Sequence, residues 1–175
     1  MSSPSLSQIG LFGLAVMGQN LALNIADKGF SIAVCNRSPD KVDHTVARAK
    51  EEKVKGELVG FHDVKTFVSR LAKPRAVIIL VQAGKPVDAV IAQLSEFMEE
   101  GDLIIDGGNE WFTNTQRRAE ELKSKKLLYM GMGVSGGEVR HTRSTGWWLA
   151  VARNVSIGVL TVLFVCMSLF PFLFV

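Results

Sequence analysis

The strongest constraint on the fold is an alternation of two hydrophobic patterns between Gln8 and Met130. Short apolar runs of strand length alternate there with longer segments in which apolar residues recur at the period of a helix. Parallel strands need a crossover connection, and the intervening helices supply one. The pattern therefore predicts an α/β fold in which repeated βαβ units build a parallel sheet.

The alternation predicts six strands and five helices. The expected strands are Ile9–Phe12, Ile32–Cys35, Leu58–Phe61, Ala76–Val81, Leu103–Ile105 and Leu127–Met130. The expected helices are Gly18–Asp27, Pro39–Lys53, Val64–Leu71, Pro86–Met98 and Asn114–Lys125. Ser38 can cap a helix that has Pro39 in its first position, and Gly29 and Gly101 follow expected helix ends.

The first strand leads into a glycine turn with the spacing Gly13-x-Ala15-x-x-Gly18. Gly13 permits a tight turn, Ala15 is small enough for the backbone to approach a pyrophosphate, and Gly18 lets the helix pack on the strand. Free N–H groups at the helix start would then face the anion. We expect a doubly wound, Rossmann-like dinucleotide-binding domain; the alternative is a glycine turn that binds no ligand.

The end of the second expected strand distinguishes between two nicotinamide cofactors. In dinucleotide-binding folds an acidic residue at this place bonds the 2′-hydroxyl of NAD. This chain has Asn36, Arg37 and Ser38 there, and no carboxylate. Arg37 offers a planar fork of donors to a 2′-phosphate, and its two neighbours add neutral donors. We therefore expect NADP rather than NAD; the alternative is that Arg37 is a solvated loop residue.

Three further strand ends carry small-residue turns with polar side chains, namely LVQAG, DGGNEW and GMGVSGGE. Ligands of parallel sheets bind outside the carboxyl ends of the strands. Glycine pairs let backbone amides approach a ligand, and Asn109 and Ser135 can donate to and accept from hydroxyls or carboxylates. Any one of these turns would suit a simple bend, but three at one edge predict a binding site.

Composition and the remaining residues exclude several classes of function. The net charge is +3 and basic residues are interleaved with acidic ones, so no nucleic-acid partner is expected. His44 and His62 have no neighbours at metal-ligand spacing and His141 lies beyond the α/β pattern, so no metal site is expected. Cys35 and Cys166 lie far apart, which argues against a disulfide framework, and the N-terminus shows no export signal; both favour the cytoplasm.

The combined motifs are specific enough to indicate a family. The sequences GLAVMGQNLALNIADKGF, NRS, LVQAGKPVD, DGGNEW and YMGMGVSGGE, in this order and spacing, closely resemble the N-terminal half of 6-phosphogluconate dehydrogenase, an NADP-dependent decarboxylating enzyme of the pentose phosphate pathway. The resemblance runs from about Ile9 to Glu138.

The resemblance implies two sets of contacts. The residues implied to bind cofactor are Gly13, Leu14, Ala15, Val16, Met17, Gly18, Asn36, Arg37, Ser38, Val81, Gln82, Ala83 and Asn109. The residues implied to bind the substrate 6-phosphogluconate are Asn109, Ser135, Gly136 and Gly137.

Two departures from the family pattern limit what is transferred. Gln82 stands where the family usually has lysine, which removes a positive charge near the cofactor. The resemblance also stops at Glu138, before the segment that supplies the family's catalytic lysine and glutamate and before the helical domain that builds its homodimer. We therefore assign no catalytic residue. We expect residues 1–138 to be an NADP-binding domain, and the 175-residue chain alone to be inactive.

The segment 139–175 has a different character. Residues 154–175 carry no charge and are long enough, at about 1.5 Å per residue, to cross a hydrocarbon core of about 30 Å. Arg153 and the neighbouring Trp147 and Trp148 would suit a membrane interface, which describes a tail anchor. The alternative is that the sequence from Val139 onward results from translation past an exon end.

Three functional hypotheses remain. The first is a truncated 6-phosphogluconate dehydrogenase, whose intact form converts 6-phosphogluconate to ribulose 5-phosphate with NADP. The second is a non-catalytic NADP-binding module, in the cytoplasm or anchored to a membrane by its tail. The third is a related β-hydroxyacid dehydrogenase with another substrate, against which the DGGNEW and GVSGGE motifs argue.

Overall fold

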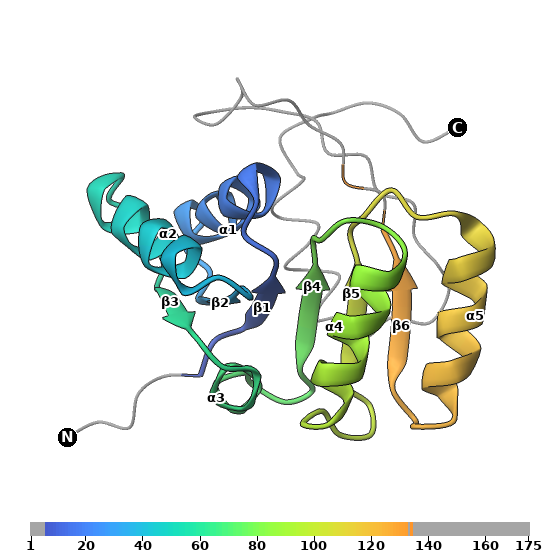
Figure 1. Ribbon diagram of the computed structural model, residues 1–175. Coiled ribbons are helices and arrows are strands. Elements are labelled where there is room, and N and C mark those ends of the chain that lie inside the picture. Colours follow the sequence, from blue (N-terminus) through green and yellow to red (C-terminus); the bar gives the residue numbers. More distant parts are fainter. Residues whose placement is uncertain (1–5, 133, 135–175) are drawn as a thin grey trace, which may run out of the picture.

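A single parallel sheet forms the centre of the computed structural model, which describes residues 6–132 and 134 (Figure 1). The strand order is β3-β2-β1-β4-β5-β6, and every neighbouring pair is parallel. The strands are β1 Ile9–Phe12, β2 Ile32–Cys35, β3 Leu58–Phe61, β4 Ala76–Ile79, β5 Leu103–Asp106 and β6 Leu128–Gly131. The order reverses between β1 and β4, which is where open α/β sheets bind ligands. The prediction of a doubly wound, Rossmann-like sheet is confirmed.

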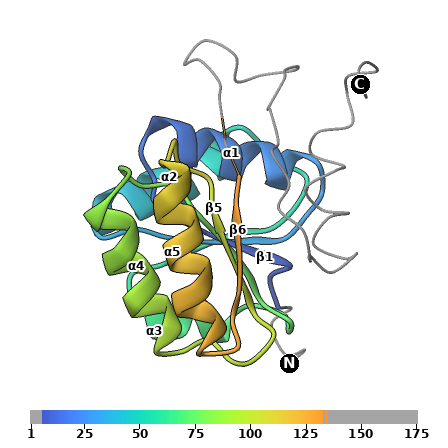
Figure 2. The ribbon, with the colours of Figure 1, turned by 90° about the vertical axis from the view of Figure 1, so that its right-hand side faces the viewer.

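The helices cover both faces of this sheet. They are α1 Val16–Asp27, α2 Pro39–Glu51, α3 Val64–Ser69, α4 Lys85–Ser95 and α5 Phe112–Lys123. Figures 1 and 2 show α1 and α2 on one face and α3, α4 and α5 on the other. Successive strand residues point to opposite faces, so Leu11 and Ile78 pack in the α1 core while Val77 and Ile79 pack in the core of α3, α4 and α5.

The four central strands are apolar along their whole length because both of their faces are buried in these two cores. Every residue of β1, β2, β4 and β5 is buried, whereas β3 and β6 are the two outer strands and are partly exposed. Below, the carboxyl edge and the amino edge of the sheet are the sides at which the strands end and begin. Ile78 and Ile104 are 0% exposed, one in each core. Truncation of such a side chain to alanine costs about 2–5 kcal/mol of stability, so both cores stabilise the sheet that carries the loops.

The predicted elements all exist, but several end elsewhere. The strand expected over Ala76–Val81 stops at Ile79, because the chain turns out of the sheet where the Leu80 carbonyl lies against Gly13. Helix α5 begins at Phe112 rather than Asn114, because the N–H of Asn114 already donates to the Trp111 carbonyl at 2.9 Å.

The residues predicted to cap the helices lie at the helix ends, but not all of them make the expected capping interaction. Gly29 and Gly101 have φ of 90° and 86°, the left-handed conformation expected after a helix. Ser38 lies at the N-cap of α2 and Pro39 follows in the first turn, yet the Ser38 side chain makes no capping hydrogen bond. Its side chain is exposed at the end of β2 instead.

The predictions for residues 139–175, including the domain boundary at Glu138 and a membrane span over 154–175, lie outside the described residues. Within residues 6–132 and 134, no helix combines the length and the apolar character that a membrane crossing needs.

Candidate nucleotide-binding site

The turn between β1 and α1 is closed so tightly that two of its positions accept only glycine. Gly13 has φ +109°, and a Cβ atom there would lie 2.3 Å from the Leu80 carbonyl oxygen. A Cβ atom on Gly18 would lie 1.9 Å from the Gly13 carbonyl oxygen. The predicted roles of both glycines, a tight turn and close helix packing, are therefore visible as backbone contacts.

The start of α1 faces outward without a side-chain cap. Its N-cap residue Ala15 provides no acceptor, and Ala15 and Val16 are exposed. The first N–H groups of a helix lack partners within the helix and carry a partial positive charge. This helix start can thus accept an anion such as a pyrophosphate.

Asn36, at the end of β2, holds this turn in place. The Leu14 N–H donates to Asn36 Oδ1 at 3.0 Å, and the Leu14 carbonyl accepts from Gln19 Nε2 at 3.1 Å. Asn36 Nδ2 in turn donates to the Ser38 carbonyl at 3.2 Å. Oδ1 and one of the two Nδ2 hydrogens are used inside the protein, so Asn36 shapes the turn and keeps a second N–H donor.

The neighbouring side chains of this loop remain available. Arg37 and Ser38 are exposed, and among the described residues Arg37 forms no ion pair. Cys35 beside them is a buried free thiol, as its place in a strand predicted, and burial raises its pKa to about 11. A neutral thiol leaves Arg37 as the charged group at the end of β2.

The turns after β4 and β5 lie next to each other at the same edge. Gly107 donates its N–H to the Ile79 carbonyl at 2.9 Å, which ties the two strand ends together. Gln82, Ala83 and Asn109 are exposed at these turns, and Val81 is partly buried. The structure therefore brings the predicted residues of both turns to one edge of the sheet.

The segment after β6 approaches the same place. Met132 donates its N–H to the Asp106 carbonyl at 2.7 Å, and Val134 donates to the Gly107 carbonyl at 3.3 Å. The predicted substrate residues Ser135, Gly136 and Gly137 follow directly and lie outside the described residues.

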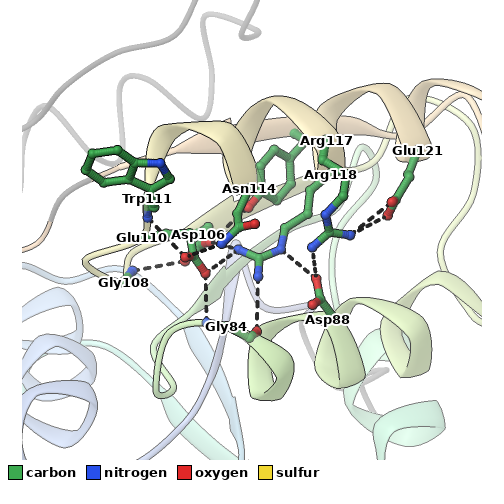
Figure 3. A network of polar contacts seen from close by, with 11 residues as sticks. Gly84, Asp88, Asp106, Gly108, Glu110, Trp111, Asn114, Arg117, Arg118 and Glu121 are labelled. Carbon is green, nitrogen blue, oxygen red and sulfur yellow. Dashed lines mark hydrogen bonds and ion pairs between the residues drawn. The ribbon is translucent and has the colours of Figure 1, made fainter.

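A buried guanidinium connects the turn after β4 with the turn after β5, as Figure 3 shows. Arg118 of α5 is 1% exposed and binds Asp88 of α4 at 2.7 Å, Asp106 at 3.1 Å and Glu110 at 2.7 Å. It also donates to the Gly84 carbonyl at 3.0 Å. We call this set of residues, together with Tyr129, which donates its hydroxyl to Asp106 at 2.8 Å, the Arg118 network.

The network fixes the ionisation of its members. A hydrogen bond from Asn114, with others from the Gly84 N–H and Arg118, lowers the pKa of Glu110 from 4.5 to about 2 against the effect of burial. Burial opposes the charged form of Arg118, but hydrogen bonds to Asp88 and Glu110 outweigh it and raise its pKa. Burial, and then the charge of Asp106, raises the pKa of Tyr129. Glu110 and Arg118 are therefore both charged at neutral pH.

The Arg118 network was not predicted from the sequence. An arginine pair on a polar helix suggests two solvated side chains, and only the spacing of Arg118 four residues before the buried Leu122 places it on the inner face. Two exposed aromatic residues, Trp111 at 66% and Phe112 at 60%, also lie at this edge, with ring centroids 5.2 Å apart. In the described part of the chain no group of three or more potential metal ligands occurs.

Comparisons with known proteins agree with this geometry. The model of the family described as the NAD binding domain of 6-phosphogluconate dehydrogenase matches residues 8–150. The decarboxylating 6-phosphogluconate dehydrogenase 1 of Spinacia oleracea is 62% identical over 134 residues, which are 75% of this chain and 27% of that protein.

Two solved structures show the same fold. The 6-phosphogluconate dehydrogenase of Plasmodium falciparum, studied with its cofactor NADP+ and with its substrate 6-phosphogluconate, matches with a TM-score of 0.70 and 50% identity over 75% of this chain and 28% of that one. The 3-hydroxyisobutyrate dehydrogenase of Mycobacterium tuberculosis matches with a TM-score of 0.64 and 19% identity over 76% of this chain and 42% of that one, which shows the fold alone. The chain thus spans little more than a quarter of the length of the 6-phosphogluconate dehydrogenases that it matches.

Proposed function

Because the chain belongs to the family of NAD-binding domains of 6-phosphogluconate dehydrogenase, we propose that it binds NADP at the carboxyl edge of its sheet. The observation that carries this proposal is Arg37, which is exposed, lacks an ion-pair partner among the described residues and stands where NAD-binding domains have an acidic residue. A guanidinium there attracts the 2′-phosphate, and no carboxylate of this loop repels it.

The donor set of the site fits the cofactor. The uncapped start of α1 receives the pyrophosphate, with Gly13 through Gly18 letting it approach the backbone. Arg37 and the Ser38 hydroxyl receive the 2′-phosphate. Since the dinucleotide crosses the sheet where the strand order reverses, its nicotinamide half extends over β4 and β5.

The turns after β4 and β5 then receive the nicotinamide half. Val81, Gln82 and Ala83 border it from one turn and Asn109 from the other, where Asn109 also faces the substrate. Gln82 offers a neutral amide at a position for which the family resemblance implies lysine. Cofactor affinity at this half therefore depends on hydrogen bonding rather than on charge.

The activity that we propose for the intact protein is oxidative decarboxylation of 6-phosphogluconate to ribulose 5-phosphate. NADP supplies the hydride acceptor, and Asn109 with Ser135, Gly136 and Gly137 bind the sugar acid. We assign no catalytic acid or base to the described residues. The 175-residue polypeptide is accordingly expected to bind cofactor without turnover, while dimer formation and the role of the segment 139–175 stay predictions.

Calorimetric titration of the 175-residue polypeptide with NADP and with NAD tests the proposal. We expect tighter binding of NADP, and Arg37→Ala should weaken NADP binding by about 10- to 100-fold, the value of a charged hydrogen bond, and leave NAD binding nearly unchanged. Lys50→Ala, an equal change of charge on the exposed last turn of α2, is the matched control and should retain wild-type affinity. Equal affinity for both cofactors, or an Arg37→Ala variant with unchanged NADP affinity, would contradict the assignment.

A further inference from the structure

The peptide groups of Gly84 are held from both sides by two side chains that also bind each other. The Gly84 N–H donates to Glu110 Oε2 at 2.8 Å, and the Gly84 carbonyl accepts from Arg118 Nη2 at 3.0 Å. Arg118 and Glu110 are joined at 2.7 Å. Gly84 has φ 88° and ψ −137°, a conformation that favours glycine. A residue with this freedom is thus fixed in one conformation by an ion pair.

The same carboxylate orders the loop that contains Asn109. Glu110 Oε1 accepts from the Trp111 N–H at 3.0 Å and from Asn114 Nδ2 at 2.9 Å. On the other side of Asn109, the Gly108 N–H donates to Asp106 Oδ1 at 3.0 Å. Figure 3 shows the anchored residues Gly108 and Trp111. Asn109 therefore lies between two anchored backbone amides in the sequence, while the residue itself is exposed.

We infer that Glu110 and Arg118 are positioning residues that lock the turn 81–84 and the loop 108–111 into one rigid unit. The inference rests on the proposed function, because it assigns this unit to the nicotinamide half of NADP. A loop that is already ordered loses less conformational freedom when a ligand binds, so the ion pair raises affinity without touching the cofactor. It also keeps Gln82 and Asn109 at a constant separation.

A general loss of stability could also weaken NADP binding, and the chain contains a second buried ion pair that serves as a control for this effect. Arg75 is 8% exposed and binds the buried Asp102 at 2.9 Å, as Arg118 binds Asp106, but it lies before β4 at the opposite edge of the sheet. Arg75→Met removes a buried guanidinium of the same kind far from the turns at the carboxyl edge. The Arg75→Met variant therefore measures how the loss of a buried guanidinium changes NADP affinity when the turns 81–84 and 108–111 are untouched.

The test compares Arg118→Met, Arg118→Lys, Glu110→Gln and Arg75→Met in the 175-residue polypeptide. Amide hydrogen exchange without cofactor should show that the Gly84 and Trp111 N–H groups exchange at least about tenfold faster in the Arg118→Met and Glu110→Gln variants and at the wild-type rate in Arg75→Met. NADP affinity should fall at least about tenfold in the same two variants, recover in part in Arg118→Lys, and stay within about twofold of wild type in Arg75→Met.

The outcomes separate the inference from the proposed function. Wild-type NADP affinity in both Arg118→Met and Glu110→Gln overturns the inference, as does an equal loss of affinity in Arg75→Met. Failure of the wild-type polypeptide to bind NADP overturns the proposed function instead, and the exchange rates of Gly84 and Trp111 then still decide whether the ion pair orders the two turns. If Arg118→Met does not fold, Glu110→Gln and Arg118→Lys provide the same comparison.

Discussion

Strand β5 is preceded by one buried aspartate and ends in another, and the two serve different edges of the sheet. Asp102, at the amino edge, accepts hydrogen bonds from the Arg75 backbone and side chain and from the Glu99 N–H. Asp106, at the carboxyl edge, accepts from the Gly108 N–H, Arg118 and Tyr129. The two are 2% and 1% exposed.

The difference lies in what each aspartate holds. The partners of Asp102 are the residue before β4 and the turn after α4, which complete the ends of regular elements. The partners of Asp106 include the glycine next to Asn109 and an arginine that also holds Gly84. Nearly the same buried chemistry thus closes the sheet at one edge and orders two turns at the other, where we propose that NADP binds.

Removing either aspartate should have the largest effect on stability. Asp102→Ala and Asp106→Ala each remove the most buried ion-pair partner of a buried arginine and an acceptor of three hydrogen bonds, which costs about 3–5 kcal/mol of unfolding free energy. Urea denaturation at pH 7 measures both values, with Glu121→Ala as a control that removes an exposed pair on α5 and should cost less than about 1 kcal/mol. A loss below about 1 kcal/mol for either aspartate would show that its network does not stabilise the fold.

The two edges of the sheet should also differ in how acid changes their contribution to the unfolding free energy. The pKa of Glu110 in the folded protein is about 2, below its ordinary 4.5, so the stability that its charge contributes is complete above pH 4.5 and is lost as the pH falls toward 2. Glu110→Gln should therefore flatten the dependence of unfolding free energy on pH in this window. At neutral pH the variant should lose about 1.5–3 kcal/mol, the value of a charged hydrogen bond.

Glu99 provides the matched carboxylate at the amino edge. The hydrogen bond from Lys73, and then one from Arg75, lowers the pKa of Glu99 as well, but its side chain is 57% exposed. Solvent screens such a pair, so Glu99→Gln should change the acid dependence less than Glu110→Gln does. Denaturation curves between pH 2 and pH 7 compare the two, and an equal effect would mean that burial at the carboxyl edge adds nothing.

Local sequence patterns predicted the elements and the glycine turn because these depend on neighbours along the chain. Alternating apolar periods marked the strands. Gly18 was recognisable because its close contact, the Gly13 carbonyl, lies within the same turn, and Gly13 because its φ of +109° is a local backbone conformation that favours glycine. The Arg118 network depends on contacts between residues up to 34 positions apart, and no sequence pattern identifies such partners, although helical spacing indicates that Arg118 faces inward. The same holds for Asn36, whose partner Leu14 lies 22 positions away.

NADP binding at the carboxyl edge of the sheet, and not at the amino edge, can be observed residue by residue. Titration of the isotopically labelled polypeptide with NADP, followed by the NMR shifts of its backbone amides, tests this directly. We expect shifts at Gly13 through Gly18, Arg37, Gln82 and Asn109, with Arg75 and Asp102 unchanged. Shifts concentrated around Arg75 and Asp102, or no shifts at millimolar NADP, would contradict it.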